Sequence, residues 1–288
     1  MPLKSKLALY EPCNANSNRY FAFKLKQDHY IEPTEHQTPS KLLVISNIEG
    51  NFHDFRKLLL QSGIIDGSYH WIFGEGHLVI TGNCLGENEK GVEALWLAYA
   101  LEEKARSKGG YVHFILGKNE ISNLNGKWYN KHPKYVNNKK TSQTPYVVLY
   151  DGNNELRRWL KTKNIVEKIG DLIISNTDIS NHPTSSHSSF IELNNQVRKY
   201  CSNSPKLQPI SRLSDVAYDL LNDKYLQPLG VLSQSTPFRY KLMKKKVVDL
   251  TYIFPNNDEV ISNPSRASDQ IDALLIENYQ FYRIDTKV

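Results

Sequence analysis

Cysteine is scarce in this chain, which has three cysteines in 288 residues: Cys13, Cys84 and Cys201. An odd and widely spaced set is not a disulfide framework, so we expect an intracellular, reducing compartment. We favour the cytoplasm, with the mitochondrion as the alternative. Cys84 has no base beside it in the sequence, and we interpret it as a passive side chain.

Long apolar runs are also missing. No stretch approaches the length of a membrane span, which predicts a protein without a transmembrane helix. Residues 1–26 are basic but lack the apolar centre of a secretory signal.

Acidic residues are outnumbered by basic ones, 30 against 36, and the formal net charge is +6. The densest basic runs are 139–140 and 244–246. Basic proteins attract polyanions without sequence preference, so nucleic acid is one partner to consider. No nucleic-acid-binding module is recognisable, however, and short lysine runs are typical of solvated faces.

The size and the 40% hydrophobic content are sufficient for one large core. Residues 1–40 are polar, and we interpret them as an irregular N-terminal extension. Residues 41–288 are then expected to form a single domain.

Four apolar, β-branched runs have the length of strands: 41–46, 77–81, 111–116 and 171–175. Helical spacing of apolar residues follows the first two runs, in 52–59 and 92–99. Strands that alternate with helices predict a largely parallel sheet covered by helices. Each run ends in a polar loop, and loops at the carboxyl ends of such strands lie at one edge of the sheet. We therefore expect the loops 47–51, 82–88, 117–120 and 176–178 to converge.

Scattered segments of the chain resemble the calcineurin-like metallophosphoesterase superfamily, on its bacterial-type serine/threonine protein phosphatase side. The matching segments are 50–52, 71–79, 109–114, 123–128, 132–135, 273–278 and 281–285. The resemblance implies an α/β fold, a metallophosphoesterase-like β-sandwich flanked by helices in α/β/β/α layers. It also implies a two-metal site in the converging loops.

The first two loops depart from the pattern of that family. Its first loop has Asp-x-His-Gly, whereas this chain has Asn47 in the aspartate place and Glu49 in the histidine place. Its second loop has a bridging aspartate followed by Asp-Arg-Gly. Asn83 stands at the bridging place here, and the residues that follow are Gly86, Glu87 and Asn88.

The later loops depart as well. In the third loop, Gly-Asn-His-Glu becomes Gly117, Lys118, Asn119 and Glu120. Asn176 occupies the place of the ligand histidine in the fourth loop. The family's last ligands come from a late Gly-His-x-His segment, which cannot exist here because no histidine follows His187.

These exchanges remove the chemistry that two metal ions require. A pair of divalent cations about 4 Å apart needs anionic ligands to offset its repulsion, and the amides supply no charge. The lost imidazoles take away the nitrogen ligands. The sequence therefore predicts no metal, no cofactor and no catalytic residue. It favours a pseudophosphatase that acts as a scaffold or structural subunit through a protein partner or larger assembly.

Some alternatives stay open at this stage. The ammonium of Lys118 fills the vacated metal space and pairs with Glu49, or it faces solvent. Glu49, Asn47 and Asn83 bind one hard cation through oxygen, in which case the protein is an active phosphoesterase with an altered one-metal site. His53, His113 and His132 are the histidines to consider in this half of the chain. His53 and His113 lie outside the ligand places of the motif, and we interpret both as structural.

Overall fold

The computed structural model describes residues 6–10, 20–45, 48–86, 88, 90–124, 155–170, 172–176, 187–202, 231–232, 271–278 and 280–285. Its strands are β1 (Lys6–Tyr10), β2 (Tyr20–Lys24), β3 (Glu35–His36), β4 (Lys41–Ile45), β5 (His77–Ile80), β6 (Tyr111–Phe114), β7 (Val166–Ile169), β8 (Leu172–Ser175), β9 (Val231–Leu232), β10 (Asp272–Glu277) and β11 (Gln280–Asp285). Its helices are α1 (Phe52–Gln61), α2 (Gly91–Arg106), α3 (Lys118–Leu124), α6 (Glu155–Leu160) and α7 (His187–Ser202).

A five-stranded sheet has the order β11-β10-β4-β5-β6. Strands β4, β5 and β6 are parallel to one another, and Ile45 pairs with Ile80, which pairs with Phe114. The hairpin β10–β11 adds antiparallel to β4. Three of the four apolar runs predicted as strands form β4, β5 and β6 of this sheet, with β6 at its edge, whereas the run at 171–175 forms β8 of the other sheet. The carboxyl ends of β4, β5 and β6 consequently lie at one edge.

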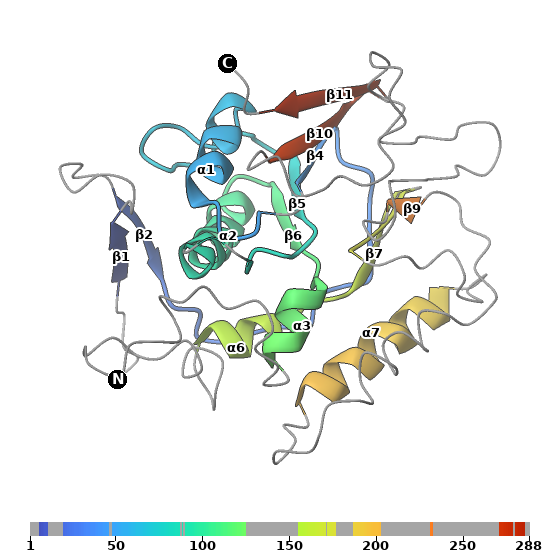
Figure 1. Cartoon of the computed structure of the whole chain (residues 1–288). Helices are drawn as coiled ribbons and strands as arrows, with labels where there is room; N and C mark the ends of the chain where they lie inside the picture. The colour runs from blue at the N-terminus through green and yellow to red at the C-terminus, as the bar shows by residue number, and fades with distance from the viewer. Residues whose placement is uncertain are drawn as a thin grey trace, which may run out of the picture.

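A four-stranded sheet has the order β3-β7-β8-β9. Strand β3 is parallel to β7, β7 is antiparallel to β8, and β8 is parallel to β9. Helices α1 and α2 lie beside the five-stranded sheet, and α7 contacts β7 of the other sheet (Figure 1). This arrangement confirms the expected α/β fold with sheets flanked by helices.

The residues between the two sheets are of two kinds. One end of the layer is an apolar cluster that consists of Leu42, Val44, Val79, Ile115, Ile169, Ile174 and Leu274. Because successive side chains of a strand point to opposite faces, His77 and Val79 of β5 share this inner face. Val79 pairs with His113 of β6, so imidazoles extend the layer beyond its apolar part.

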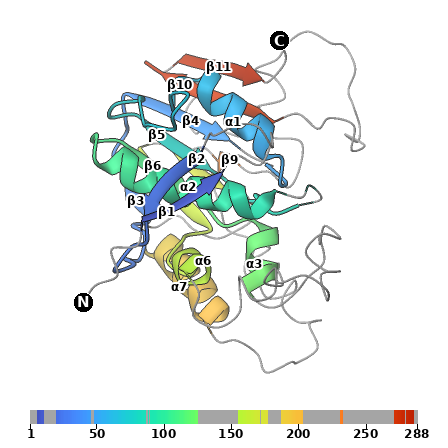
Figure 2. The same ribbon diagram turned by 90° about the vertical axis from the view of Figure 1, so that its left-hand side faces the viewer.

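Helix α2 is buried almost all round, unlike a surface helix with one apolar stripe. One side contacts β6 and the opposite side contacts the β1–β2 hairpin, as Figure 2 shows. The ring of Phe23 stacks on Trp96 with their centroids 5.0 Å apart. The expectation of an irregular segment at 1–40 is therefore wrong, because the apolar outer face of α2 provides a surface on which this hairpin packs.

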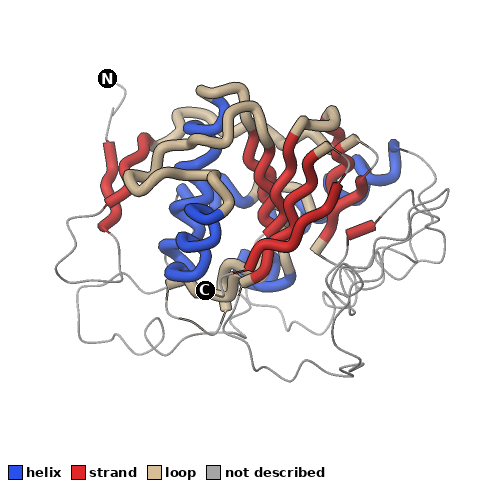
Figure 3. Tube along the Cα trace, turned by 90° about the horizontal axis from the view of Figure 1, so that it is seen from above, coloured by secondary structure: helices blue, strands red, loops and turns tan. Residues whose placement is uncertain are grey.

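A buried ion network fixes the chain between the hairpin and β3. Lys163 is 3% exposed, and its Nζ lies 2.6 Å from both Glu32 Oε2 and Glu102 Oε1. Burial opposes its charge, yet Glu102 and Glu32 raise the pKa of Lys163 above the usual value. Lys26 also pairs with Glu102. The network joins the N-terminal segment to α2 and to the loop after α6. In Figure 3, a helix lies between the hairpin next to the N-terminus and the strands of the sheets.

Within the described ranges, no helix combines the length and the apolar character needed to cross a membrane.

The strand β4 lies at the centre of the five-stranded sheet, and Leu43 is fully buried there. We expect Leu43→Ala to lower the free energy of unfolding by about 2–5 kcal/mol, because it removes buried methyl groups and leaves a cavity. Urea denaturation followed by circular dichroism measures this change. Leu25→Ala is the control, since Leu25 is 38% exposed, and it should alter stability by less than about 0.5 kcal/mol. Equal losses in both variants would contradict the assignment of β4 to the core.

Candidate functional site

The first two predicted loops lie against each other and are joined through their backbones. The N–H of Glu49 donates to the carbonyl of Asn83 at 2.7 Å, and that of Gly50 donates to Cys84 at 2.7 Å. The N–H of Asn88 returns to the carbonyl of Glu49 at 3.0 Å. The backbone φ angles of Glu49 and Asn83 are both positive, 47° and 51°, a conformation that residues other than glycine adopt rarely. The loops are thus held in a strained but hydrogen-bonded arrangement.

Glu120 ties the second loop to the third. It is fully buried, and its Oε2 accepts the N–H of Asn83 at 2.7 Å and that of Gly117 at 3.1 Å. Its Oε1 accepts the N–H of Leu85 at 3.2 Å. Burial raises the pKa of Glu120, while these backbone donors act in the opposite direction. The carboxyl group therefore serves backbone N–H groups of two loops.

Asparagine side chains stand at places where the resembled family has metal ligands, and these amides are hydrogen-bonded within the protein. Asn119 Nδ2 donates to the carbonyl of Leu85 at 2.6 Å, and Asn176 Nδ2 donates to the carbonyl of Thr81. The N–H of Asn119 approaches Asn83 Oδ1 at 3.4 Å. The four loops therefore converge as predicted, and their side chains bond to one another's backbones.

The packing of these loops leaves no space for added carbon at two glycines. A Cβ on Gly117 would lie 2.6 Å from Asn83 Oδ1 and 3.0 Å from Asn176 Oδ1. A Cβ on Gly86 would lie 2.5 Å from Cβ of Glu49. Two amide oxygens therefore converge above Gly117, and Glu49 is pressed against the second loop.

Part of the predicted site cannot be placed. Asn47 and Glu87 lie outside the described residues. Lys118 begins α3, but its side chain is not among those described, so its pairing with Glu49 stays a prediction. The residues that the structure does bring together are Glu49, Asn83, Gly86, Asn88, Asn119 and Asn176.

Three further side chains were singled out by the sequence. His53 is exposed in the first turn of α1, and His132 lies outside the described residues. Cys84 is fully buried, and burial together with the charge of Glu120 raises the pKa of its thiol well above the usual value. Its thiol stays protonated at neutral pH, in agreement with a passive role.

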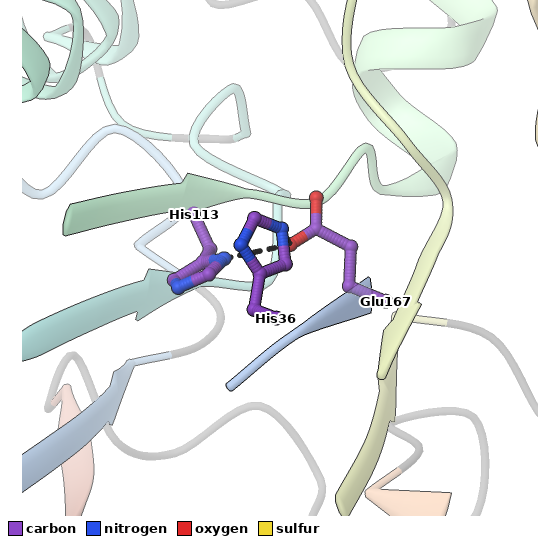
Figure 4. A group of neighbouring side chains, drawn as sticks. All are labelled: His36, His113 and Glu167. Atoms are coloured by element: carbon purple, nitrogen blue, oxygen red, sulfur yellow. Dashed lines mark hydrogen bonds and ion pairs between the residues drawn. The ribbon is translucent and has the colours of Figure 1, made fainter. Parts of the chain in front are cut away.

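A second polar centre lies between the two sheets, where the sequence predicted only a structural histidine. His113 of β6, His36 of β3 and Glu167 of β7 point toward one another (Figure 4). Glu167 Oε2 is 2.7 Å from His113 Nδ1 and 3.5 Å from His36 Nε2. The far nitrogen of His113, Nε2, is 2.9 Å from Nδ1 of His77.

The protonation of this centre follows from its burial. Burial lowers the pKa of His113 to about 3 and that of His77 to about 4. Burial also raises the pKa of Glu167, and the charge of Glu32 adds to this effect. These pKa shifts favour uncharged imidazoles and a protonated Glu167 carboxyl at neutral pH, with one proton between Glu167 Oε2 and His113 Nδ1.

Sequence reasoning missed this centre because its members come from four separate segments with no shared motif. The available signal was the period of two in 77–80 and 111–114, which places His77 and His113 on the inner faces of adjacent strands. Nothing comparable marks His36, which belongs to a strand of two residues.

A cavity of about 300 Å³ lies between residues 24–30, the end of α2 and the buried pair Glu32 and Lys163. Its lining carries the cations Lys24 and Arg106 and the anions Asp28 and Glu103. The mixture of signs gives it no evident preference for an anionic ligand.

The role of Glu120 can be tested by Glu120→Gln. Whichever way the new amide turns, its NH₂ faces at least one backbone N–H, so the free energy of unfolding should fall by about 1–3 kcal/mol. Glu75→Gln is the matched control because Glu75 is exposed. Thermal or urea unfolding measures both variants. An unchanged stability of Glu120→Gln would mean that this carboxyl does not hold the loops.

Comparison with known proteins adds information on the fold. No protein-family model matches the chain. Shewanella-like protein phosphatase 2 of Arabidopsis thaliana is 27% identical over 96 residues, which are 33% of this chain and 25% of that protein. The match thus spans about a quarter of the length of this curated relative.

Two solved structures cover nearly the whole chain. The cold-active protein-tyrosine phosphatase of a psychrophilic Shewanella species has a TM-score of 0.68 at 22% identity, over 98% of this chain and 91% of that one. A structure of a cold-active protein tyrosine phosphatase at 1.1 Å has a TM-score of 0.65 at 21% identity, over 98% and 92%. The chain therefore shares the sandwich fold of these phosphatases.

Proposed function

We propose that this protein is a catalytically inactive metallophosphoesterase-like protein that acts as a scaffold or structural subunit through protein–protein contacts. The observation that carries the proposal is the chemistry of the converged loops. Where the family presents charged ligands and imidazoles, this chain has amides whose NH₂ groups donate to Leu85 and Thr81.

The charge of the loops supports the same conclusion. Among the loop side chains that the structure describes, the carboxyl groups are those of Glu49 and Glu120. Glu120 already accepts three backbone N–H groups. Glu49 alone supplies too little negative charge to offset the repulsion of two neighbouring divalent cations. Among the described loop residues, a two-metal phosphatase reaction therefore lacks the anionic ligands that it needs to form its nucleophile.

The fold supports a scaffold because its loops do not depend on an ion for their shape. Backbone hydrogen bonds between the first and second loops, and those that Glu120 accepts from Asn83 and Gly117, connect the loops through protein groups alone. Such a sandwich stays rigid and offers its surface to a partner. The relatives named above are phosphatases. The loss of activity proposed for this chain is therefore inferred from its own loop residues and not from those relatives.

One observation favours a second candidate, an active phosphoesterase with an altered one-metal site. The amide oxygens of Asn83 and Asn176 converge above Gly117, and Glu49 packs against the neighbouring loop. Oxygen ligands of this kind suit a single hard cation such as Mg²⁺ or Ca²⁺. This candidate requires that both the metal and the turnover depend on Glu49.

Calorimetric titration of metal-stripped protein with Mn²⁺, together with hydrolysis of p-nitrophenyl phosphate, separates the two candidates. We expect the heat of Mn²⁺ binding to be the same in the unmodified protein and in Glu49→Ala, and we expect no hydrolysis that depends on Glu49. Glu49→Ala is compared with Glu75→Ala, an exposed site that leaves the loops intact. Metal-dependent hydrolysis that Glu49→Ala removes and Glu75→Ala retains would overturn the proposal in favour of the one-metal enzyme.

The scaffold role has its own test. The full-length protein, tagged in its native cells and purified at low salt, should elute in size-exclusion chromatography with a stoichiometric partner. Elution as a lone monomer under those conditions would count against a structural-subunit role.

A further inference from the structure

We propose that the cluster of His36, His113 and Glu167 between the two sheets is a binding site for a divalent transition-metal ion, with Zn²⁺ as the best fit. This site is separate from the converged loops. It would join the two halves of the sandwich and take no part in phosphoester chemistry.

The spacing of the ligand atoms carries the proposal. One atom from each residue can be chosen so that all three lie within 4.8 Å of one another. A tetrahedral zinc ion with bonds of about 2.1 Å separates its ligands by about 3.4 Å. His36 Nε2 and Glu167 Oε2 are already 3.5 Å apart. The closest pair, His113 Nδ1 and Glu167 Oε2, is 2.7 Å apart and must open by about 0.7 Å.

The donor types select the class of metal. Two imidazole nitrogens and one carboxylate oxygen suit zinc and its neighbours in the first transition series. Calcium and magnesium prefer sites made wholly of oxygen. With three protein ligands, a tetrahedral ion has one position left for solvent.

A hydrogen bond to His77 orients the ring of His113. A histidine that coordinates through Nδ1 must carry its proton on Nε2, and that proton needs an acceptor. Nδ1 of His77 lies 2.9 Å from Nε2 of His113 and provides this acceptor. His77 therefore positions the ligand without contacting the metal itself.

A hydrogen bond from Asn164 orients the carboxylate of Glu167. Asn164 Nδ2 donates to Glu167 Oε1 at 3.0 Å, which leaves Oε2 directed at the two imidazoles. Arg198 Nη1 in turn donates to Asn164 Oδ1 at 2.5 Å. Nearby Lys163 is neutralised by Glu32 and Glu102, so it does not draw Glu167 away. Ligands held in this way lose little freedom when an ion arrives.

Binding requires two small changes and one proton balance. The ion replaces the proton that Glu167 shares with His113, and that proton leaves to solvent. His36 Nε2 lies 3.1 Å from the carbonyl oxygen of Pro33, so it must exchange this hydrogen bond for the metal and carry its own proton on Nδ1. The side chain of His36 is 9% exposed, which provides the route of entry.

The ion would have a structural effect because its ligands belong to different sheets. His36 and Glu167 come from the neighbouring strands β3 and β7, whereas His113 comes from β6. Coordination therefore links the four-stranded sheet to the edge of the five-stranded one. It would also fasten β3, whose two residues make few ladder bonds.

The experiment uses the full-length chain without a polyhistidine tag, stripped by a chelator and titrated with Co²⁺. We expect one Co²⁺ per chain, with the strong visible absorption of a tetrahedral site, displaced by Zn²⁺. Zn²⁺ should also raise the thermal midpoint of unfolding, because it binds the folded state. Absence of this absorption in folded protein would overturn the proposal.

Variants assign the site. His36→Ala lies at the rim of the cluster and Glu167→Gln keeps the shape of its side chain, so each should fold and lose the Co²⁺ absorption. His77→Ala should retain the stoichiometry but bind about 10–100 times more weakly, as expected for a residue that orients a ligand. His70→Ala is the control, since His70 is an exposed histidine paired with Asp66 and should change nothing.

Glu49→Ala distinguishes this site from the loops. If the absorption is lost in Glu49→Ala and kept in His36→Ala, the metal belongs to the loops and the proposal is wrong. If both variants keep it, the binding is adventitious and the proposal is also wrong. This test does not measure phosphoester hydrolysis. If the metal-site proposal fails, the proposed function is therefore unaffected.

Discussion

Hydrogen bonds from Asn164, a fully buried residue, connect more separated parts of this molecule than a hydrophobic contact can. Its Nδ2 donates to the carbonyl of Pro33 and to Glu167, and its Oδ1 accepts from Arg198 of α7. Buried polar groups must find partners, so this requirement fixes the N-terminal segment, the four-stranded sheet and α7 relative to one another. The apolar cluster between the sheets has seven members, and the polar network completes the layer.

The same requirement explains why the converged loops keep their shape. In a metalloenzyme, ions and their ligands hold such loops together. In this chain, the backbone bonds between the first two loops and the backbone N–H groups that donate to Glu120 also connect these loops. A protein that stabilises its loops by internal hydrogen bonds is free to lose its metal ligands without losing its fold. The proposed loss of catalytic activity is therefore physically compatible with an intact fold.

The sequence was a good guide where one segment carried the whole signal. The apolar runs at 41–46 and 77–81 predicted β4 and β5, and the polar residues after them predicted the converging loops. It was a poor guide where a feature needed distant partners. The strands β1 and β2 lie in a polar part of the sequence, and for this reason they were not predicted. They form a hairpin that packs on α2, a partner distant in the sequence. The centre around His113 draws one residue from each of several strands. The period of two indicates only that His77 and His113 share an inner face, and no spacing indicates His36 or Glu167.

The hairpin also has a consequence for the order in which the chain is assembled. The backbone N–H of Lys26 donates to the hydroxyl of Tyr99, 73 residues further along the chain, and the ring of Phe23 stacks on Trp96. During synthesis these N-terminal residues leave the ribosome long before the helix that they cover exists. Closing so long a loop costs entropy that only the completed contact returns. Strands β1 and β2 thus cannot take up their final position until the helix that they cover has been made.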